Sequence, residues 1–260
     1  MSRLFRRVWA VEVAGRRSEG LTVHFGARYP GRGEPAQCDV RVFMPPREMV
    51  AALYSPGTEC RVLAGYVDTG AVEVFAGVPI PGSVEDARQE VSWQLSASRT
   101  YAARRVVSRS WADVRASEVI DYLRRQMGLS ADYLELPQDV RYARGHNVEG
   151  PARRELETVV ADCGATYSIE GASLRVYPEG GSVPRAADAW TPGSGLLEIV
   201  GPEGSGEVRA MALLRPALRP GDTVPVRSPR WDGDVRVQEV RHDGQSDETR
   251  WQTEIVGVAA

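Results

Sequence analysis

The stretch at residues 90–97 reads EVSWQLSA and decides the fold class of the chain. Its apolar side chains occupy every second position: Val91, Trp93, Leu95 and Ala97. Because successive side chains of an extended chain point to opposite faces, this period of two predicts a β-strand with one buried face. Residues 37–42 repeat the pattern, with Cys38, Val40 and Val42 placed between polar neighbours. The sequence around these two segments is therefore expected to form a β-sheet.

Short apolar segments separated by turn residues continue this pattern in both directions. Residues 8–14 and 21–25 predict a hairpin whose turn is the polar stretch 16–20. Pro46 predicts the first turn of a short helix that runs to Leu53. Further strands are predicted at 58–66, 71–80, 208–214, 223–227, 235–241 and 251–258. In the strand at 235–241, the apolar alternation slips by one residue, which predicts a β-bulge. Short strands at this spacing indicate a barrel or a sandwich.

The pattern changes between residues 110 and 178. Ser117 is expected to cap an amphipathic helix that stops at Gly128, and a second helix is expected to open at Pro151 and stop at Gly164. Residues 166–176 then predict a hairpin with its turn at Gly171. The Gly/Pro-rich stretch 180–195 is typical of a connection between domains. The predicted fold class is therefore mainly β with an α/β insertion.

Composition excludes several classes of protein. The 260 residues include 26 glycines and 17 prolines, so long helical bundles are disfavoured. All 32 basic residues are arginine, and 35 acidic residues bring the net charge to -3, which disfavours nucleic-acid binding as the main role. The cysteines Cys38, Cys60 and Cys163 are too scattered for a disulfide framework or a metal site. The chain has no apolar run of the roughly 18 residues that a membrane span needs, and its start is expected to be a strand of a cytosolic product, not a signal peptide.

The serines and the glycine-rich loop do not match known catalytic motifs. Ser194 and Ser205 both lie in Gly-Ser-Gly contexts, but neither has the GxSxG pattern of a nucleophile elbow, so both are interpreted as loop residues. Residues 201–206 (GPEGSG) lack the Lys-Ser/Thr of a phosphate-binding loop. The three histidines, His24, His146 and His242, lie in three different regions and are interpreted as satisfied or solvated side chains.

The acidic and basic candidate residues are explained better by structural roles than by catalysis or ligand binding. Asp232 and Asp234 flank a glycine as in a calcium loop, but the other oxygen donors are missing, so a turn between strands is predicted. Glu155 and Glu157 are expected to complement the dipole of the helix that they open. Arg3, Arg6 and Arg7 are expected to be solvated at the chain start. The sequence therefore predicts no catalytic, cofactor-binding or metal-binding residue, and no cofactor.

Several stretches, in this order, resemble the baseplate hub proteins of tailed bacteriophages, the family that includes the late control protein D type. Residues 64–66 (AGY) and 74–80 (VFAGVPI) resemble a pair of strands around "GY" and "FxGxI". Residues 213–222 (LLRPALRPGD) resemble "LLNPxLxPGxxV", and residues 233–237 with 240–244 resemble "GxYxVxxVxHxGD". The middle of the chain, with the helix that ends at Gly128, Leu136-Pro137, the helix at 156–164 and the Gly171 hairpin, resembles the family's inserted domain. Arg215 and Val235 depart from the pattern, since asparagine and an aromatic residue are commoner there.

The resemblance implies two tube-like β-barrel domains at residues 1–105 and 185–260 that flank an inserted α/β domain at 110–180. It also implies a non-enzymatic hub: a homotrimeric ring between a sixfold tail tube and a threefold central spike. The implied partners are the spike, the tail tube or distal tail protein, and the tape measure protein, with neither specific nucleic-acid binding nor membrane insertion. The implied location is the virion tail or baseplate, assembled in the cytoplasm of the host bacterium. Two alternatives stay open: a hub of a related injection or gene-transfer particle, and a tail-associated cell-wall hydrolase.

Overall fold

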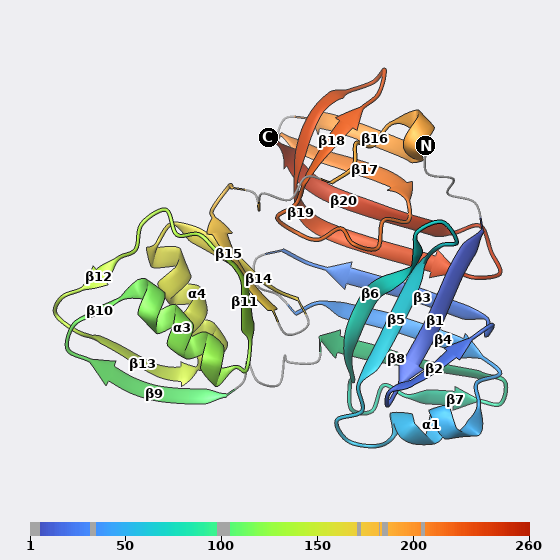
Figure 1. Cartoon of the computed structure of the whole chain (residues 1–260), viewed down its shortest axis with the longest axis horizontal. Helices are drawn as coiled ribbons and strands as arrows, with labels where there is room; N and C mark the ends of the chain where they lie inside the picture. The colour runs from blue at the N-terminus through green and yellow to red at the C-terminus, as the bar shows by residue number, and fades with distance from the viewer. Residues whose placement is uncertain are drawn as a thin grey trace. The chain divides into compact units, whose positions relative to one another are not determined.

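The computed structural model describes residues 6–31, 35–97, 105–170, 173–181, 183, 187–203 and 206–260. The chain divides into two compact units (Figure 1). Unit 1 comprises Met1–Pro30, Ala36–Ala97 and Pro184–Ala260, and unit 2 comprises Gly31–Pro35 and Ser98–Val183. The predicted fold class, mainly β with an α/β insertion, is confirmed.

Unit 1 is built from two β regions that are far apart in sequence. The first region consists of β1 (Arg7–Val13), β2 (Arg16–Glu19), β3 (Val23–Tyr29), β4 (Gln37–Phe43), α1 (Arg47–Leu53), β5 (Cys60–Tyr66), β6 (Gly70–Pro79), β7 (Glu85–Ala87) and β8 (Glu90–Ala97). The second region consists of η1 (Pro192–Ser194), β16 (Leu196–Glu203), β17 (Glu207–Leu213), β18 (Thr223–Arg227), β19 (Asp232–Gln245) and β20 (Trp251–Ala259).

One continuous sheet joins the two regions. Its strand order is β16-β17-β20-β19-β3-β4-β8-β6-β5-β1-β2, with β18 paired to β19 and β7 to β8. The 14-residue strand β19 makes the junction, because its first residues pair with β18 and its last six, from Val240, pair antiparallel with β3. In Figure 1 the blue strand β3 accordingly lies beside the red strand β19. The two β regions therefore share backbone hydrogen bonds.

The apolar core of unit 1 also crosses this junction. Trp93, Trp190 and Trp251 are among its largest fully buried side chains. Trp251 of β20 packs edge-on against Phe25 of β3 and Trp9 of β1, with ring centroids 5.6 and 6.1 Å apart. Large aromatic side chains contribute much of the stabilisation of a core because each removes a large apolar surface from water. The two regions are therefore held together by side chains as well as by the sheet. The prediction that they form separate barrel domains stays a prediction.

Unit 2 packs two helices against short strands. Its elements are β9 (Val106–Trp111), β10 (Val114–Arg115), α3 (Ala116–Gln126), β11 (Ser130–Leu134), β12 (Arg141–Tyr142), β13 (His146–Pro151), α4 (Ala152–Asp162), β14 (Ala165–Glu170) and β15 (Ser173–Pro178). Ile120 and Leu123 of α3, Leu156 of α4 and Leu174 of β15 lie fully buried in one apolar core. Both helices present the predicted apolar stripe to this core.

The structure confirms most of the predicted elements and corrects several. The predicted bulge is present, as a register shift between Val237 and Glu239 against β20. The turn predicted at 16–20 is wrong, because these residues mostly form strand β2 and the chain reverses at Ala14-Gly15, both at positive φ. Strand β16 was not predicted; it follows the predicted connection directly and takes in the first three residues of the glycine-rich stretch 201–206. The hairpin turn predicted at Gly171 lies outside the described residues.

The predicted helix cap at Ser117 is also wrong. Helix α3 begins one residue earlier, after Arg115, and the cap comes from another segment. Asp139 accepts hydrogen bonds from the Ser117 backbone N–H at 3.0 Å and from its hydroxyl at 2.9 Å. A carboxylate at a helix N-terminus accepts hydrogen bonds from the free N–H groups and interacts favourably with the positive end of the helix dipole. Long-range capping of this kind has no local sequence signal.

The three cysteines are free and buried. Burial raises the pKa of Cys60 to about 12, so this thiol is not a thiolate at neutral pH. Among the described residues, no helix is long and apolar enough to span a membrane.

Candidate functional site

A polar face of the sheet in unit 1 is the first candidate surface. On β3, β4 and β8 the residues that alternate with the core point away from it. The register places Asp243, Gly26, Asp39 and Gln94 in one row across β19, β3, β4 and β8. The Gln94 side-chain amide donates a hydrogen bond to the Asp39 carboxylate at 2.9 Å. Asp243 lies close to Gly26, since a Cβ added to Gly26 would be only 3.3 Å from the Asp243 carboxylate. Glycine thus leaves room for the carboxylate over the strand.

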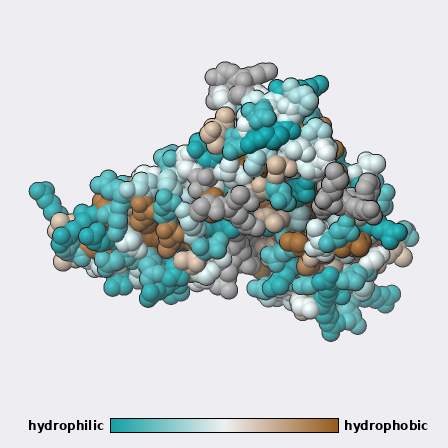
Figure 2. Space-filling model, turned by 45° about the horizontal axis from the view of Figure 1, so that its top comes forward, coloured by the Kyte–Doolittle hydropathy of each residue, from teal (hydrophilic) through white to brown (hydrophobic). Residues whose placement is uncertain are grey.

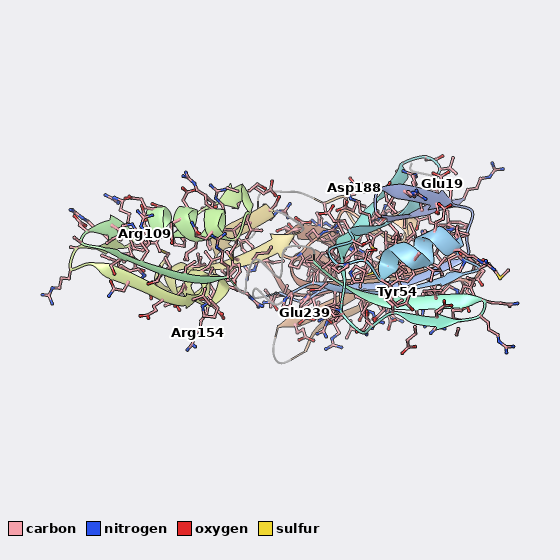
Figure 3. All side chains as sticks on the ribbon, turned by 90° about the horizontal axis from the view of Figure 1, so that it is seen from below. Glu19, Tyr54, Arg109, Arg154, Asp188 and Glu239 are labelled. Atoms are coloured by element: carbon pink, nitrogen blue, oxygen red, sulfur yellow. The ribbon has the colours of Figure 1, made fainter. Side chains whose placement is uncertain are left out.

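This row crosses a hollow of about 670 Å³ in the polar face. Side chains of both signs line it, among them Arg41, Glu85, Arg241 and Asp243. Most of its charged groups have partners: Arg241 pairs with Asp243 at 3.0 Å, and Arg41 pairs with Glu90 at 3.0 Å. Outside the hollow on the same sheet, Arg28 pairs with Glu239, which is labelled in Figure 3, at 3.7 Å. Because opposite charges are paired along it, the face is strongly polar but carries little net charge.

His24 also lines this hollow and is paired. Its Nε2 lies 2.6 Å from Asp247, and this hydrogen bond lowers the pKa of the Asp247 carboxyl. The phenyl ring of Phe43 packs edge-on against the imidazole. His24 is therefore a satisfied surface histidine, as predicted.

A buried polar network at the junction of the two β regions is the second candidate site. Its centre is Arg219, in the loop that follows β17, with 9% of its surface exposed. The guanidinium donates to the carbonyls of Leu218 at 2.8 Å and of Glu73 and Val74 in β6, both at 3.3 Å. It also lies over the ring of Tyr29, 4.4 Å from the centroid. One side chain of the second β region thus binds backbone of the first.

His242 completes the network from β19. It is fully buried, and its Nδ1 lies 2.9 Å from the Thr253 hydroxyl while its Nε2 lies 3.2 Å from the Leu218 carbonyl. Since the Thr253 hydroxyl accepts from the Arg215 backbone N–H at 2.8 Å, it is free to donate to Nδ1, and Nε2 then carries the proton given to Leu218. Burial, and next the charge of Arg219, lower the pKa of His242 to about 3. The imidazole is therefore neutral at physiological pH.

The motif at residues 213–222 is explained by this network. Asp222 accepts from the Arg219 backbone N–H at 2.9 Å, which closes the turn, and Gly221 takes a positive φ of 90° that favours glycine. The turn holds Arg219 in the core and directs the chain into β18. These contacts are structural, since they satisfy buried donors and acceptors within the protein.

The remaining predicted candidates are dispersed. Ser194 closes a capping box with Thr191 in η1, with its hydroxyl donating to Ala189 at 2.8 Å. Asp232 and Asp234 lie in strand β19 and not in the predicted turn. Both carboxylates form ion pairs with the Arg227 guanidinium, with N···O distances of 3.5 Å for Asp232 and 2.7 Å for Asp234. Glu155 lies in the first turn of α4, as predicted, whereas Glu157 lies beyond that turn.

The other candidates lie in both units. His146 stacks on Tyr142 in unit 2, with ring centroids 4.1 Å apart. Arg7 is not simply solvated, because it donates to Thr249 at 2.8 Å and lies over the ring of Trp251. Ser205 and Arg3 lie outside the described residues. In the part of the chain that is described, no group of three or more His, Cys, Asp or Glu side chains could hold a metal ion.

Solved structures share this fold over nearly the whole chain. A tail protein from Neisseria meningitidis MC58 superposes with a TM-score of 0.70 at 10% identity, covering 98% of this chain and 97% of that one. The 43 kDa tail protein of prophage MuSo2 from Shewanella oneidensis gives 0.67 at 10% identity, with 97% of each chain covered. The E. coli c3393 protein, a component of the type VI secretion system with structural similarity to the T4 tail proteins gp27 and gp5, gives 0.64 at 10% identity, covering 96% and 76%. The sequence matches no protein-family model and no curated protein sequence.

Proposed function

We propose that this chain is a non-enzymatic structural protein of a phage tail, the hub at the tail tip. The observation that carries the proposal is the fold shared with two tail proteins, one of them from a prophage, over 97% or more of this chain. The site geometry supports the same role, since the buried polar groups around Arg219 and His242 bind one another. A protein of this kind acts through its surfaces.

The proposed assembly is a homotrimeric ring. Each chain carries two β regions side by side in one sheet, so three chains present six β regions. Such a ring would match a sixfold tail tube on one side and a threefold central spike on the other. Its partners would be the spike, the tube or distal tail protein and the tape measure protein. It would be assembled in the bacterial cytoplasm and located in the baseplate.

The edge strand β16 is the proposed contact between neighbouring chains. Within the described residues β16 pairs with β17 alone, so its other edge presents free backbone groups. It also exposes two large apolar side chains, Leu197 at 52% and Val200 at 46%. Figure 2 shows apolar residues reaching the surface in small groups among hydrophilic ones. An exposed apolar edge strand is a site for pairing with another chain.

The polar face of the sheet is the proposed lining of the channel. DNA must pass such a channel without being held, and arginines that neutralise phosphates would hold it. On this face Arg28, Arg41 and Arg241 are already paired with carboxylates. A hydrated lining of paired charges offers few free cations to phosphate.

The ring is tested by light-scattering mass in solution and by electron microscopy. The expected mass is about three times the chain mass of 28.5 kDa, alone or with the spike protein present, and the expected class averages are threefold or sixfold rings. Leu197→Glu should reduce the trimer, whereas Leu134→Glu in unit 2, at a leucine that is similarly exposed at 46%, should not. A stable monomer that ignores the spike would count against the proposal.

A hub of a contractile secretion particle is the second candidate. The specific observation in its favour is the fold shared with the type VI secretion component c3393. A hydrolase role is tested separately, by incubating the chain with peptidoglycan. Release of soluble fragments would overturn the non-enzymatic proposal.

A further inference from the structure

Unit 1 contains a second cavity, of about 310 Å³, at the junction of the two β regions. Three separate segments line it: the hairpin of β5 and β6, the stretch before η1, and the loop after β17. Its lining includes Tyr66, Val72, Asp188, Trp190, Arg215 and Ala217. A cavity of this size accommodates one large side chain or a small molecule.

Tyr66 points to a missing hydrogen-bond acceptor in this cavity. Only 4% of its surface is exposed, and its hydroxyl is buried with no hydrogen-bond partner among the described residues. The Leu214 N–H lies near the hydroxyl, but it already donates to the Trp251 carbonyl at 3.0 Å. Burial raises the pKa of Tyr66 to about 12, so the group stays a protonated donor. A buried donor without an acceptor costs free energy until a partner supplies one.

Arg215 brings a second such donor to the same cavity. Its Nε is buried and without a partner in the described part of the chain, although Nη2 donates to the Ser194 carbonyl. Both unused groups are donors, so the complementary ligand atom is an acceptor. The cavity also carries the carboxylates of Asp188 and Asp222; Asp188 is exposed and is labelled in Figure 3. Because a carboxylate ligand would be repelled by these groups, a neutral carbonyl fits better.

We propose that this cavity binds a peptide segment of another protein of the particle, which inserts one large apolar side chain and presents its main-chain carbonyl to Tyr66 and Arg215. The occupant's class rests on the proposed function, since a structural tail protein works through protein contacts. An exposed apolar side chain also stands at the rim of the cavity, because Val72 lines it and is 38% exposed. A peptide segment that extends past the cavity would cover this valine, whereas a small molecule within the cavity would leave it in water.

The test uses N-acetyl-tryptophanamide, which carries one large apolar side chain and two neutral carbonyls, titrated into the isotope-labelled full chain. Amide NMR shifts are expected at Tyr66, Thr69 and the loop at 214–218. Ala217→Trp should abolish them by filling the cavity, because Ala217 is exposed and lines it. Ala143→Trp, at an exposed alanine of unit 2, is the matched control and should leave binding unchanged. The unchanged remainder of each spectrum verifies the fold.

Tyr66→Phe tests the hydrogen bond itself and should weaken binding about threefold to tenfold. Shifts at other sites, or binding that survives Ala217→Trp, would overturn the proposal, as would an affinity that neither Tyr66→Phe nor Arg215→Met alters. Shifts at the same residues that depend on protein concentration without the probe would identify a second copy of the chain as the occupant instead. The titration does not require a trimer, so its failure is distinguishable from a failure of the ring.

Discussion

Arg219 in unit 1 and Arg175 in unit 2 have nearly the same burial, with 9% and 7% of their surfaces exposed, yet they are stabilised differently. Arg219 binds neutral backbone carbonyls of both β regions and the ring of Tyr29. Arg175 binds the carboxylate of Asp132 at 2.6 Å, and that carboxylate is 48% exposed. The Arg219 guanidinium therefore joins segments about 145 residues apart through several hydrogen bonds to backbone carbonyls. Arg175, in contrast, joins the paired strands β15 and β11 through an ion pair at the surface.

The largest effect is expected for Arg219→Met. The substitution removes the guanidinium hydrogen bond to the Glu73 carbonyl and one of the side-chain donors of the Leu218 and Val74 carbonyls, which also accept from His242 and Tyr29. At roughly 1–3 kcal/mol for each lost hydrogen bond to a charged group, the free energy of unfolding should fall by about 4 kcal/mol. Urea unfolding followed by tryptophan fluorescence measures it, since Trp93, Trp190 and Trp251 are buried in this core. A loss below about 1 kcal/mol would show that the network does not hold the β regions together.

Arg175→Met should lower the free energy of unfolding by less, about 2 kcal/mol, because the Asp132 carboxylate can be hydrated when its partner is removed.

Substitution by lysine is expected to distinguish the two arginines further. Arg175→Lys should recover most of the loss, since one ammonium can pair with one carboxylate, whereas Arg219→Lys should not, because an ammonium lacks the planar fork. Hydrogen exchange of β11 and β15 reports on unit 2 separately from unit 1. Equal rescue at both positions would contradict the distinction.

The free energy of unfolding is expected to depend on pH through His242 at the junction of the two β regions. The pKa of His242 is about 3 in the folded chain and about 6.5 when unfolded, so the unfolded state binds a proton first as the pH falls. The stabilisation by neutral His242 is therefore fully present above about pH 6.5 and is lost progressively toward about pH 3, by about 1.4 kcal/mol per pH unit. Urea unfolding near pH 6 and pH 5 measures this slope.

His242→Gln should flatten that slope by this amount. His146→Gln is the control, because His146 lies outside the network, on β13. Identical slopes for the natural chain and His242→Gln would show that His242 is not held neutral.

The smallest effect concerns the long-range cap of α3. Asp139→Ala removes both hydrogen bonds to Ser117 and should cost about 1 kcal/mol, seen as faster hydrogen exchange in the first turn of α3. Ser117→Ala keeps the backbone hydrogen bond and should cost less than half of this. If Ser117→Ala costs as much as Asp139→Ala, the serine is the cap after all.

Alternation in the sequence was sufficient to predict the strands that carry the polar face. Gln37, Asp39 and Arg41 are exposed on β4 because their neighbours form the core. The row that brings Asp243, Gly26 and Asp39 together was not predictable, since it depends on the pairing of strands more than 200 residues apart in sequence. Strand β16 was missed because its sequence, LLEIVGPE, lacks alternation and contains Gly201-Pro202, which ordinarily indicates a turn.

The buried junction was the part of the site that sequence reasoning did not find. The stretch 213–222 was identified only by its resemblance to a family pattern, and an arginine outside a predicted strand or helix is normally solvated. Arg219 is buried because β6 and β19 surround it, and neither is near it in sequence. The only local signal is Asp222, three residues later, which can bind the Arg219 backbone and hold the turn around the side chain.

The pairing of β3 with β19 also determines when the protein can finish folding during synthesis. Strand β3 emerges early from the ribosome, but its partner begins at Val240, and roughly 200 residues at 5–20 residues per second take roughly 10–40 s to synthesise. Unit 2, whose described strands pair among themselves, is complete long before that. A nascent chain stalled once Val183 has left the exit tunnel, but before Val240 is added, should therefore resist protease in unit 2 while β3 is still cleaved.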